Sequence, residues 1–268
     1  GPFMLSFMRV THSVVDTSHI FIKTPVANFV HGSDFKHDMT PYDGKKSDFA
    51  KIVRKSDEGI MCLMSDCLGA EHSGFTPTEM DIGQRIHDEM DNTKGKFIFT
   101  TYSSNISRLN QVLDAAKKLN RKVCFMGRSL LKAKDVAKNL KYMDIDKSME
   151  IDLKQIGNYN NEQVVLIVAG SQGQESSALF RIANGDNKNI SINKDDTVLF
   201  SSTAIPGNEI AVNSLIDDIS KTGARVLYST VSNGLHVSGH GYQGDLALHM
   251  SLVRPKNVLP IGGTYKQM

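Results

Sequence analysis

Apolar and polar residues recur with two different periods along this chain, and each period predicts a kind of element. From about Lys96 onward, short runs rich in β-branched and aromatic residues alternate with longer segments whose apolar residues recur at helical spacing. Such alternation predicts βαβ units, and therefore a mostly parallel sheet with helices on its faces. The expected strands are KFIFTTY, RKVCFMG, EQVVLIVAG, DTVLFSS and ARVLYST, and the expected helices are SSNISRLNQVLDAAKKLN, RSLLKAKDVAKNLKYM, QESSALFRIANG and GNEIAVNSLIDDISKTG.

The first sixty or so residues follow a different pattern. Four segments there are strand-like, LSFMRVTHS, SHIFIKTP, ANFVHGSDF and GIMCLMSDC, and only KSDFAKIVRK between them has helical spacing. The last stretch, GDLALHMSLVRPKNVLPIGG, predicts a helix and then a strand. We therefore expect an α/β domain at residues 76–236 that is inserted between two pieces of another domain, residues 1–75 and 237–268.

Composition narrows the class of protein. The 268 residues suit one large domain or two ordinary ones, and an apolar fraction of 40% is enough to build packed cores. A net charge of +2 argues against a protein held to nucleic acid by bulk charge, although 31 Lys and Arg residues could still line a local groove. No apolar run approaches the roughly 18 residues of a membrane span. We expect no membrane partner.

The cysteines and the two ends of the chain carry weaker signals. Cys62, Cys67 and Cys124 are irregularly spaced in or beside apolar runs, which favours buried thiols in a reducing cytoplasm over a disulfide framework. The first residues, GPFMLSFMRV, lack the basic start and cleavage site of a signal peptide. Neither end has a helix cap or a polar tail. We therefore expect the chain to be part of a longer one.

Polar residues that could carry chemistry follow several predicted strands. The stretch GLHVSGHGYQGDL places His236, Ser238 and His240 close together among glycines. This spacing is compatible with a metal site, an acid–base site, an anion cradle or a polar turn. The loop GSQGQES, with Gly170, Ser171 and Gly173, lies between a strand and a helix. Glycines and helix-start amides can hold an anion there, although ordinary βα turns have the same composition.

Two pairs of a histidine and a carboxylate also lie at predicted strand ends. His12 and Asp34 have the donor types of a zinc site. His240 and Asp66 could form a pair in which the carboxylate orients and charges an imidazole for general-acid work. Spacing alone does not choose between these roles. A lone histidine is more often an ordinary hydrogen-bonded polar group.

Taken together, segments from almost the whole chain resemble ribonuclease J, of the β-CASP group in the metallo-β-lactamase superfamily. The resemblance implies a partial metallo-β-lactamase fold with an inserted β-CASP domain. The ten segments that match occur in the family's order. In this chain they read GPF, FMRVTHSVVDTSHIFIKTP, VHGSDFKHDMTPYDGKKSDFAKI, CLMSDC, GFTPTE, SSNISRLNQVLDAAKKLNRKV, GRSL, AGSQGQESSALFRIANG, VLFSSTAIPGNEIAVN and HVSGHG.

The resemblance also implies roles for individual residues. His12 matches a metal-binding histidine, and Asp34 matches the aspartate that bridges two zinc ions in the family. Asp66 and His240 match the acidic residue and the histidine that act together beside the scissile phosphate, with the histidine donating a proton to the leaving oxygen. The positions that match the family's RNA phosphate site are Gly170, Ser171, Gly173, His236, Ser238 and His240. Of these, His236 has only a supporting role.

The chain departs from the family pattern in two places. The main metal motif, H-x-H-x-D-H, is expected several dozen residues before GPF, so the zinc ligand set in these residues is incomplete. Near the end, PIGGTYKQM places Gly262 where the pattern P-x-H-G-x-Y has a metal-binding histidine. Glycine has no side chain to bind a metal. Another group could complete the site, the site could bind fewer metals, or catalysis could be lost.

The resemblance implies a zinc-dependent ribonuclease that hydrolyses RNA phosphodiesters, both internally and 5′→3′ from a 5′-monophosphate end, in RNA processing and decay. It also implies RNA as partner, zinc as cofactor and a homodimer or homotetramer at full length. We expect this chain by itself to have little or no activity. Three alternatives remain: a non-catalytic RNA-binding paralogue, motivated by Gly262, a related nuclease acting on DNA, and an α/β domain that binds a small phosphorylated molecule.

Overall fold

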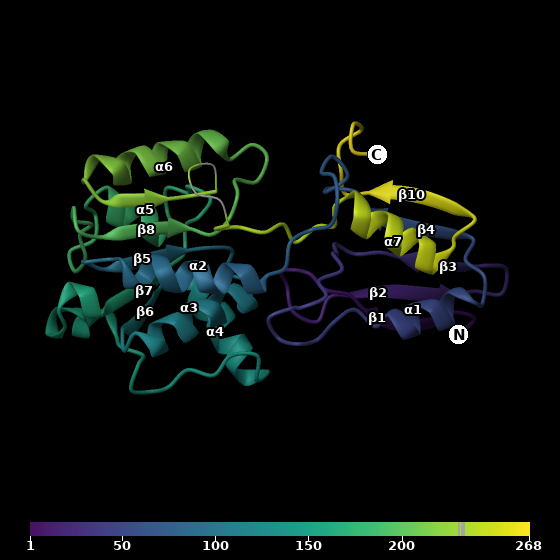
Figure 1. The fold of residues 1–268 in the computed structure, drawn as a ribbon, viewed down its shortest axis with the longest axis horizontal. Helices are drawn as coiled ribbons and strands as arrows, with labels where there is room; N and C mark the ends of the chain where they lie inside the picture. Colours follow the sequence, from purple (N-terminus) through teal and green to yellow (C-terminus); the bar gives the residue numbers. More distant parts are fainter. Residues whose placement is uncertain (230, 232–233) are drawn as a thin grey trace. The chain divides into compact units, whose positions relative to one another are not determined.

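The structure is a computed structural model that describes residues 1–229, 231 and 234–268. The chain divides into two compact units (Figure 1). Unit 1 consists of Gly1–Met80 and Val237–Met268, and unit 2 consists of Asp81–His236. The first sequence-based boundary, after residue 75, lies five residues before the division in the structure. The second, after residue 236, coincides with it.

Unit 1 is built on a mixed five-stranded sheet. Its strands are β1 (Met4–Arg9), β2 (Ser18–Lys23), β3 (Asn28–His31), β4 (Cys62–Asp66) and β10 (Asn257–Ile261), in the order β1-β2-β3-β4-β10. The pairs β1–β2 and β2–β3 are antiparallel, whereas β3, β4 and β10 run parallel. The register places Ile261 beside Asp66 and His31 beside Met64. The parallel strands therefore end close together at one edge of the sheet.

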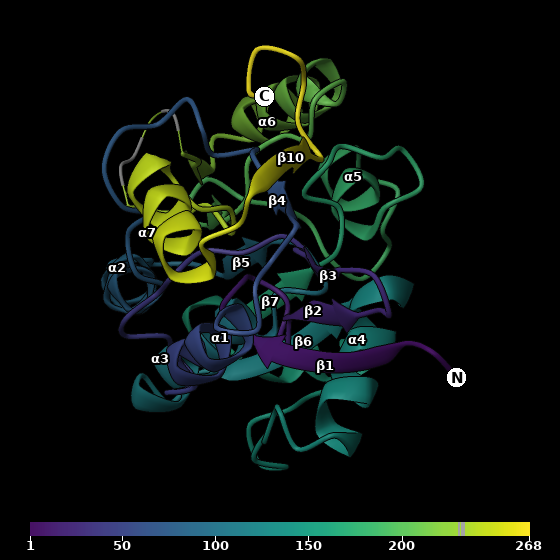
Figure 2. The same ribbon diagram turned by 90° about the vertical axis from the view of Figure 1, so that its right-hand side faces the viewer.

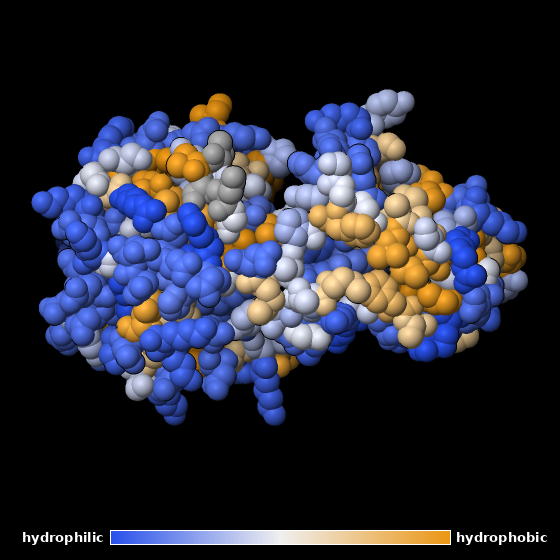
Figure 3. Space-filling model, in the orientation of Figure 1, coloured by the Kyte–Doolittle hydropathy of each residue, from blue (hydrophilic) through white to orange (hydrophobic). Residues whose placement is uncertain are grey.

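Two helices of unit 1, α1 (Phe49–Ser56) and α7 (Gln243–Val253), lie side by side against one face of this sheet (Figure 2). Asp48 caps α1, because its carboxylate accepts a hydrogen bond of 2.9 Å from the backbone N–H of Lys51. Buried strand and helix side chains form the core between them: Met8, Val10, Phe21, Val30, Phe35, Ile52, Ile60, Leu63, Leu246 and Val253. Figure 3 shows further apolar residues at the surface where α7 lies.

Unit 2 contains the parallel sheet that the alternating pattern predicted. Its strands are β5 (Phe97–Thr100), β6 (Lys122–Met126), β7 (Val164–Val168), β8 (Thr197–Phe200) and β9 (Arg225–Leu227), in the order β6-β7-β5-β8-β9. All neighbouring strands are parallel, so the predicted α/β class is confirmed. The last predicted strand is shorter than expected, and its final residue, Thr230, lies outside the described residues.

Helices cover both faces of the unit 2 sheet. They are α2 (Met80–Asp91), α3 (Ile106–Lys118), α4 (Arg128–Asn139), α5 (Ala178–Ala183) and α6 (Glu209–Lys221), with 3₁₀ helices η1 (Leu153–Asn158) and η2 (Asn161–Gln163). Leu166 of β7, Leu179 of α5 and Leu215 of α6 belong to one buried core. Successive strand residues point to opposite faces, so Phe97 and Phe99 face the other side, where α2 and α3 lie in Figure 1.

Helix α2 was not predicted from the sequence. Its buried residues Ile82, Ile86 and Met90 recur at a spacing of four, which gives a narrow apolar stripe among charged residues. The hydroxyl of Thr78 accepts a hydrogen bond of 3.2 Å from the N–H of Met80 at the start of the helix. A stripe one residue wide is a weaker signal than the broad apolar faces of α3 and α6.

Three histidines pack together in the core of unit 1. His19, His37 and His249 come from β2, from the loop after β3 and from α7, and their ring centroids are 4.7 Å apart for His19–His249 and 5.3 Å for His37–His249. Burial lowers the pKa of His19 to about 3 and that of His37 to about 4, and it lowers the pKa of His249 well below its ordinary value. All three imidazoles are therefore neutral at pH 7.

We expect unit 1 to lose stability as the pH falls below about 6.5. In the unfolded chain these histidines bind protons near pH 6.5, whereas the folded pKa values are lower, so the unfolded state takes up more protons in acid. Urea unfolding at pH 8, 6 and 5 should show a smaller acid-induced loss in His19→Leu than in the parent protein. The control is His87→Leu in α2, and equal losses in all three proteins would contradict the assignment.

Leu166→Asp should unfold unit 2. Leu166 is fully buried in the central part of the sheet, and an unpaired carboxylate there should cost about 3–5 kcal/mol. Leu140, which is 62% exposed after α4, provides the matched control Leu140→Asp. Circular dichroism melting should show a large loss for Leu166→Asp and little change for the control. A similar melting temperature for both would disprove the core assignment.

Candidate active site

Four of the predicted site residues lie at the edge of unit 1 where the parallel strands end. Asp66 is the last residue of β4, and Asp34 follows β3 after a short turn. His12 lies in the connection between β1 and β2, and His240 lies just before α7. Loops at the carboxyl ends of parallel strands commonly carry function, because the scaffold holds them while their side chains stay accessible.

Asp66 and His240 form a direct pair. The Nδ1 atom of His240 lies 2.8 Å from Oδ2 of Asp66, with the Asp66 side chain 2% exposed and the His240 side chain 27% exposed. Two backbone N–H groups also donate to this carboxylate, from Leu68 to Oδ1 at 2.9 Å and from Phe35 to Oδ2 at 3.4 Å. The carboxylate therefore orients the imidazole and is itself held by the chain on two sides.

The electrostatics of this pair follow from burial and from mutual attraction. Burial alone would raise the pKa of Asp66, but the hydrogen bond and charge of His240, with the two backbone donors, lower it below the ordinary value. Burial would likewise lower the pKa of His240, but the hydrogen bond to Asp66 and its charge raise it overall. His240 is thus suited to carry a proton near neutral pH.

His12 and Asp34 form a second pair with a different character. Nδ1 of His12 lies 2.8 Å from the carbonyl oxygen of Gly239, and Nε2 lies 3.9 Å from Oδ2 of Asp34. Burial is the main reason that the pKa of His12 is lowered, which keeps the imidazole neutral. The Asp34 side chain is 58% exposed. With Nδ1 of His12 held by Gly239, Nε2 faces the accessible Asp34, and a metal bound there would replace the hydroxyl of Ser13, which lies 3.2 Å from Nε2.

Among the described residues, one group of three side chains could hold a metal ion. The ligand atoms of Asp34, Asp66 and His240 lie within 4.8 Å of one another. Asp66 already accepts three hydrogen bonds, so Asp34 and the neighbouring His12 are better suited as ligands than Asp66. Nitrogen and oxygen donors of this kind are ligands that zinc takes. The residues present therefore fit part of a zinc site.

Ser238 shapes the loop that presents His240. Its hydroxyl lies 3.0 Å from the N–H of His240 and 3.1 Å from the carbonyl oxygen of the same residue. Ser238 belongs to unit 1, whereas the half-buried His236 is the last residue of unit 2. The other predicted phosphate-binding residues, Gly170, Ser171 and Gly173, lie in unit 2.

The loop that contains Gly170, Ser171 and Gly173 directly follows β7 and is tightly constrained. The N–H of Gly173 donates to the carbonyl oxygen of Gly170 at 3.1 Å, and Ser171 is buried. Gly173 has φ +72°, and a Cβ atom there would lie 2.4 Å from the backbone of Ala211. Gln172 ties the loop to the segment after β8, because its side-chain amide donates to the carbonyl oxygen of Thr203 at 2.9 Å. The loop is thus a fixed turn of backbone amides.

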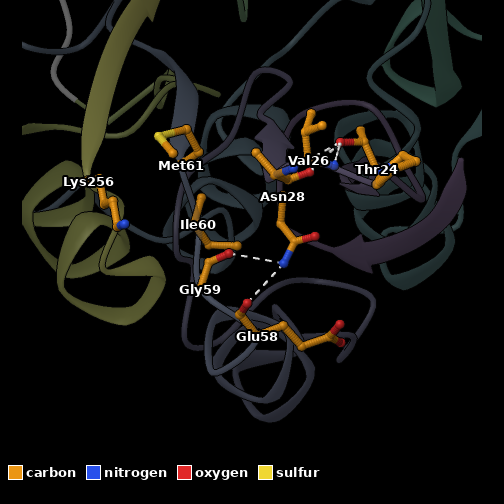
Figure 4. A pocket seen from close by; sticks show the side chains of 10 residues that line it. Thr24, Val26, Asn28, Glu58, Gly59, Ile60, Met61 and Lys256 are labelled. Carbon is orange, nitrogen blue, oxygen red and sulfur yellow. Dashed lines mark hydrogen bonds between the residues drawn. The ribbon is translucent and has the colours of Figure 1, made fainter.

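A surface pocket of unit 1 lies away from these residues (Figure 4). Its lining includes Asn28 and Met61, at the amino ends of β3 and β4, and Lys256, just before β10. The side-chain amide of Asn28 donates to the carbonyl oxygens of Glu58 and Gly59 at 2.9 and 3.1 Å, as Figure 4 shows. Because β3, β4 and β10 are parallel, this pocket and the candidate site lie at opposite edges of the sheet.

Comparison with known proteins identifies the family. Residues 94–219 match the family model for ribonuclease J, beta-CASP domain. Ribonuclease J of Helicobacter pylori is 35% identical to this chain, in an alignment that covers the whole chain and 39% of the Helicobacter protein. Ribonuclease J of Thermus thermophilus is 40% identical, in an alignment that covers 97% of this chain and 45% of the Thermus protein. The chain belongs to the ribonuclease J family. Ribonuclease J2 of Bacillus subtilis is 35% identical over 98% of the chain.

The chain spans about two fifths to one half of the length of the curated ribonuclease J relatives that it matches. A solved structure, a protein of unknown function from Enterococcus faecalis V583, superposes with a TM-score of 0.70 at 14% identity. The superposition covers 97% of this chain and 58% of the Enterococcus chain. At 14% identity the likeness supports the fold alone. In residues 1–229, 231 and 234–268, no helix is long and apolar enough to cross a membrane.

Gly262, where the ribonuclease J pattern has a histidine, directly follows β10. Its φ is +83°, a region that favours glycine, and a Cβ atom there would meet only Cδ1 of Leu68, at 4.0 Å. Space is therefore available for a side chain, but the backbone conformation disfavours one. The register that pairs Ile261 with Asp66 brings this glycine to the edge where the candidate site lies.

Sequence reasoning missed the backbone groups that fix the site. The carbonyl oxygen of Gly239 orients His12, and the N–H groups of Phe35 and Leu68 hold Asp66. No residue type reports such contacts, because every residue has the same backbone donor and acceptor. The one available signal is the glycine at position 239, where a Cβ atom would lie 2.7 Å from the His12 ring.

Asp66→Asn should lower the pKa of His240 below 6.5. The substitution removes the charge and the carboxylate acceptor that raise this pKa, while the burial that lowers it remains. Histidine NMR titration of both proteins measures the change, with the signal of His87 in α2 as an internal control. An unaltered His240 titration in Asp66→Asn would show that the pair does not set the charge of this imidazole.

Proposed function

We propose that the whole protein hydrolyses RNA phosphodiesters with the help of bound zinc. The observation that carries this proposal is the 2.8 Å contact between His240 and Asp66 beside the neutral His12 and the accessible Asp34. A charged imidazole next to a metal-binding pair suits the cleavage of a phosphodiester, where a negative charge and a leaving oxygen must both be stabilised. Membership of the ribonuclease J family supports RNA as the substrate.

We assign unit 1 to the two segments of the metallo-β-lactamase domain, and unit 2 to the inserted β-CASP domain. The match of residues 94–219 to the beta-CASP family model supports the second assignment. The mixed sheet of unit 1, with metal-ligand residues at the carboxyl ends of its strands, supports the first.

In this proposal His240 acts as the general acid. Its Nδ1 is held by Asp66, which leaves Nε2 as the proton donor to the oxygen that departs from phosphorus. The proton lost by the imidazole is replaced from solvent after product release. Asp66 remains ionised, since its pKa is lowered, and stabilises the charged imidazole before transfer.

Zinc would be held by His12 and Asp34, together with ligands of the motif H-x-H-x-D-H, which these 268 residues do not contain. When bound, zinc supplies positive charge that stabilises phosphate oxygens and lowers the pKa of water. His12 needs no deprotonation to bind, because burial already keeps it neutral. This ligand set is incomplete, so we expect these residues by themselves to have little or no activity.

We further propose phosphate contacts within each unit. In unit 2 the loop of Gly170, Ser171 and Gly173 would hold phosphate oxygens, with the N–H of Gly173 closing the turn on the carbonyl oxygen of Gly170 and His236 in a supporting role. In unit 1 Ser238 and His240 would do so. Such contacts would accommodate internal cleavage and 5′→3′ degradation from a 5′-monophosphate. We also propose a cytoplasmic location, a role in RNA processing and decay, and a homodimer or homotetramer at full length.

A second candidate function is RNA binding without hydrolysis. Gly262 favours it, because this glycine replaces a side chain that binds metal in the family pattern. In that case the phosphate contacts persist, whereas the metal site is too weak to support cleavage. The two candidates differ in whether the full-length protein with intact zinc ligands cleaves RNA.

Cleavage of 5′-monophosphorylated RNA by the full-length protein tests the proposal. EDTA should abolish cleavage by the parent, Asp34→Ala should lower the bound zinc, and His240→Ala should reduce kcat by about 10²–10⁴-fold. His87→Ala is the control and should behave like the parent. Undiminished cleavage in EDTA would exclude the zinc mechanism. RNA binding by a zinc-loaded parent that does not cleave would establish the second candidate in its place.

A further inference from the structure

A buried carboxylate behind the candidate site connects the segments that carry its residues. Asp245 lies in the first turn of α7 and is 1% exposed. Its Oδ1 accepts a hydrogen bond of 2.8 Å from the N–H of His37. Its Oδ2 accepts from the N–H of Thr76 at 2.8 Å, from the hydroxyl of Thr76 at 2.9 Å and from the N–H of Tyr242 at 3.1 Å. All four donors are uncharged.

These donors belong to three segments that are far apart in the sequence. His37 lies three residues after Asp34, and Tyr242 lies two residues after His240. The hydroxyl of Thr76 lies 3.1 Å from the carbonyl oxygen of His240 and accepts from the N–H of Tyr242 at 2.9 Å. Asp245 is therefore bonded to the backbone near both candidate site residues. The single hydroxyl hydrogen of Thr76 is donated either to Asp245 or to the carbonyl oxygen of His240, and the hydroxyl lies between them.

A direct backbone contact reinforces this connection. The N–H of Gly241 donates to the carbonyl oxygen of Phe35 at 2.6 Å, so the segments of His240 and Asp34 touch next to Asp245. A Cβ atom at Gly241 would lie 2.7 Å from the Cβ of Asp245. Only glycine lets the loop approach the carboxylate this closely. Loop and carboxylate thus fit together as one packed unit.

The bonding pattern requires a carboxylate. Both oxygens of an ionised Asp245 accept, and the start of α7 favours negative charge. An asparagine has one accepting oxygen and an amide that donates, so it would turn a donor toward either the N–H of His37 or the donors of Thr76 and Tyr242. A buried N–H left without an acceptor would move its segment.

We propose that Asp245 is a positioning residue that holds the loop of Asp34 and the loop of His240 at the separation that the reaction requires. It acts through Thr76 and the backbone and does not touch substrate. The inference rests on the proposed function for its kinetic consequence. Its structural consequence, a displacement of both loops when the carboxylate is lost, stands independently of RNA cleavage.

The test compares Asp245→Asn with variants that separate positioning from stability. In the full-length protein, Asp245→Asn should lower kcat for RNA cleavage by about 10–100-fold with KM changed less than about 3-fold, because small misplacements of reacting groups have effects of this size. Val253→Ala shortens a buried side chain at the other end of α7, away from these hydrogen bonds, and should lower the melting temperature while kcat stays near that of the parent. A kcat loss in Asp245→Asn no larger than in Val253→Ala at matched melting temperature would overturn the proposal.

A second pair of variants keeps the proposal falsifiable if Asp245→Asn does not fold. Thr76→Val removes the hydroxyl at nearly constant volume, whereas Thr76→Ser retains it. We expect Thr76→Val to lose kcat and Thr76→Ser to recover most of it. Equal activity of the two variants would contradict the role of this hydroxyl in the connection.

A readout without RNA distinguishes failure of this inference from failure of the proposed function. Backbone amide NMR shifts should move near both Asp34 and His240 in Asp245→Asn, but not in Val253→Ala. If the parent protein does not cleave RNA, the proposed function fails, and these shifts still decide whether Asp245 holds the two loops. Shifts confined to the first turn of α7 would overturn it.

Discussion

The arrangement of the candidate site depends on the buried carboxylate of Asp66. It is the last residue of β4, a strand paired with both β3 and β10, and the register places Asp66 itself beside Ile261 of β10. Its oxygens then hold two other parts of unit 1, the N–H of Phe35 next to Asp34 and the imidazole of His240. A charge this well buried is tolerated only because each oxygen has donors. The site thus inherits its rigidity from the sheet.

Parallel strands explain why these residues meet although they are up to about 230 positions apart. The carboxyl ends of β3, β4 and β10 lie at one edge, and the loops that follow them must pass over that edge. In unit 2 the all-parallel sheet likewise places the loop after β7 at the edge where its strands end, and Gln172 joins this loop to the segment after β8. In each unit the sheet places small and polar loops together, and hydrogen bonds between the loops fix them there.

The sequence was sufficient for most of the elements but not for their long-range contacts. Broad apolar faces and β-branched runs predicted every strand of unit 2, whereas the narrow stripe of Ile82, Ile86 and Met90 left α2 unrecognised. Spacing offered His12 and Asp34 as a possible pair, and the resemblance gave them roles. Neither could indicate that Asp245 and Thr76 share hydrogen bonds across 169 positions, because a buried aspartate and an ordinary helix-start aspartate look alike in a sequence.

Two features of Gly262 distinguish the turn after β10: its backbone conformation and its lack of a side chain. Gly262 has φ +83°, and the next glycine, Gly263, has no room for a Cβ atom, which would lie 2.5 Å from Sγ of Cys67. A histidine at position 262 would therefore adopt a left-handed conformation that costs roughly 1–2 kcal/mol, or would move a turn that Cys67 holds in place. The missing ligand and the shape of this turn are consequently linked. In the function proposed above, a metal bound at this edge would rely on donors from the other strand ends, His12 and Asp34.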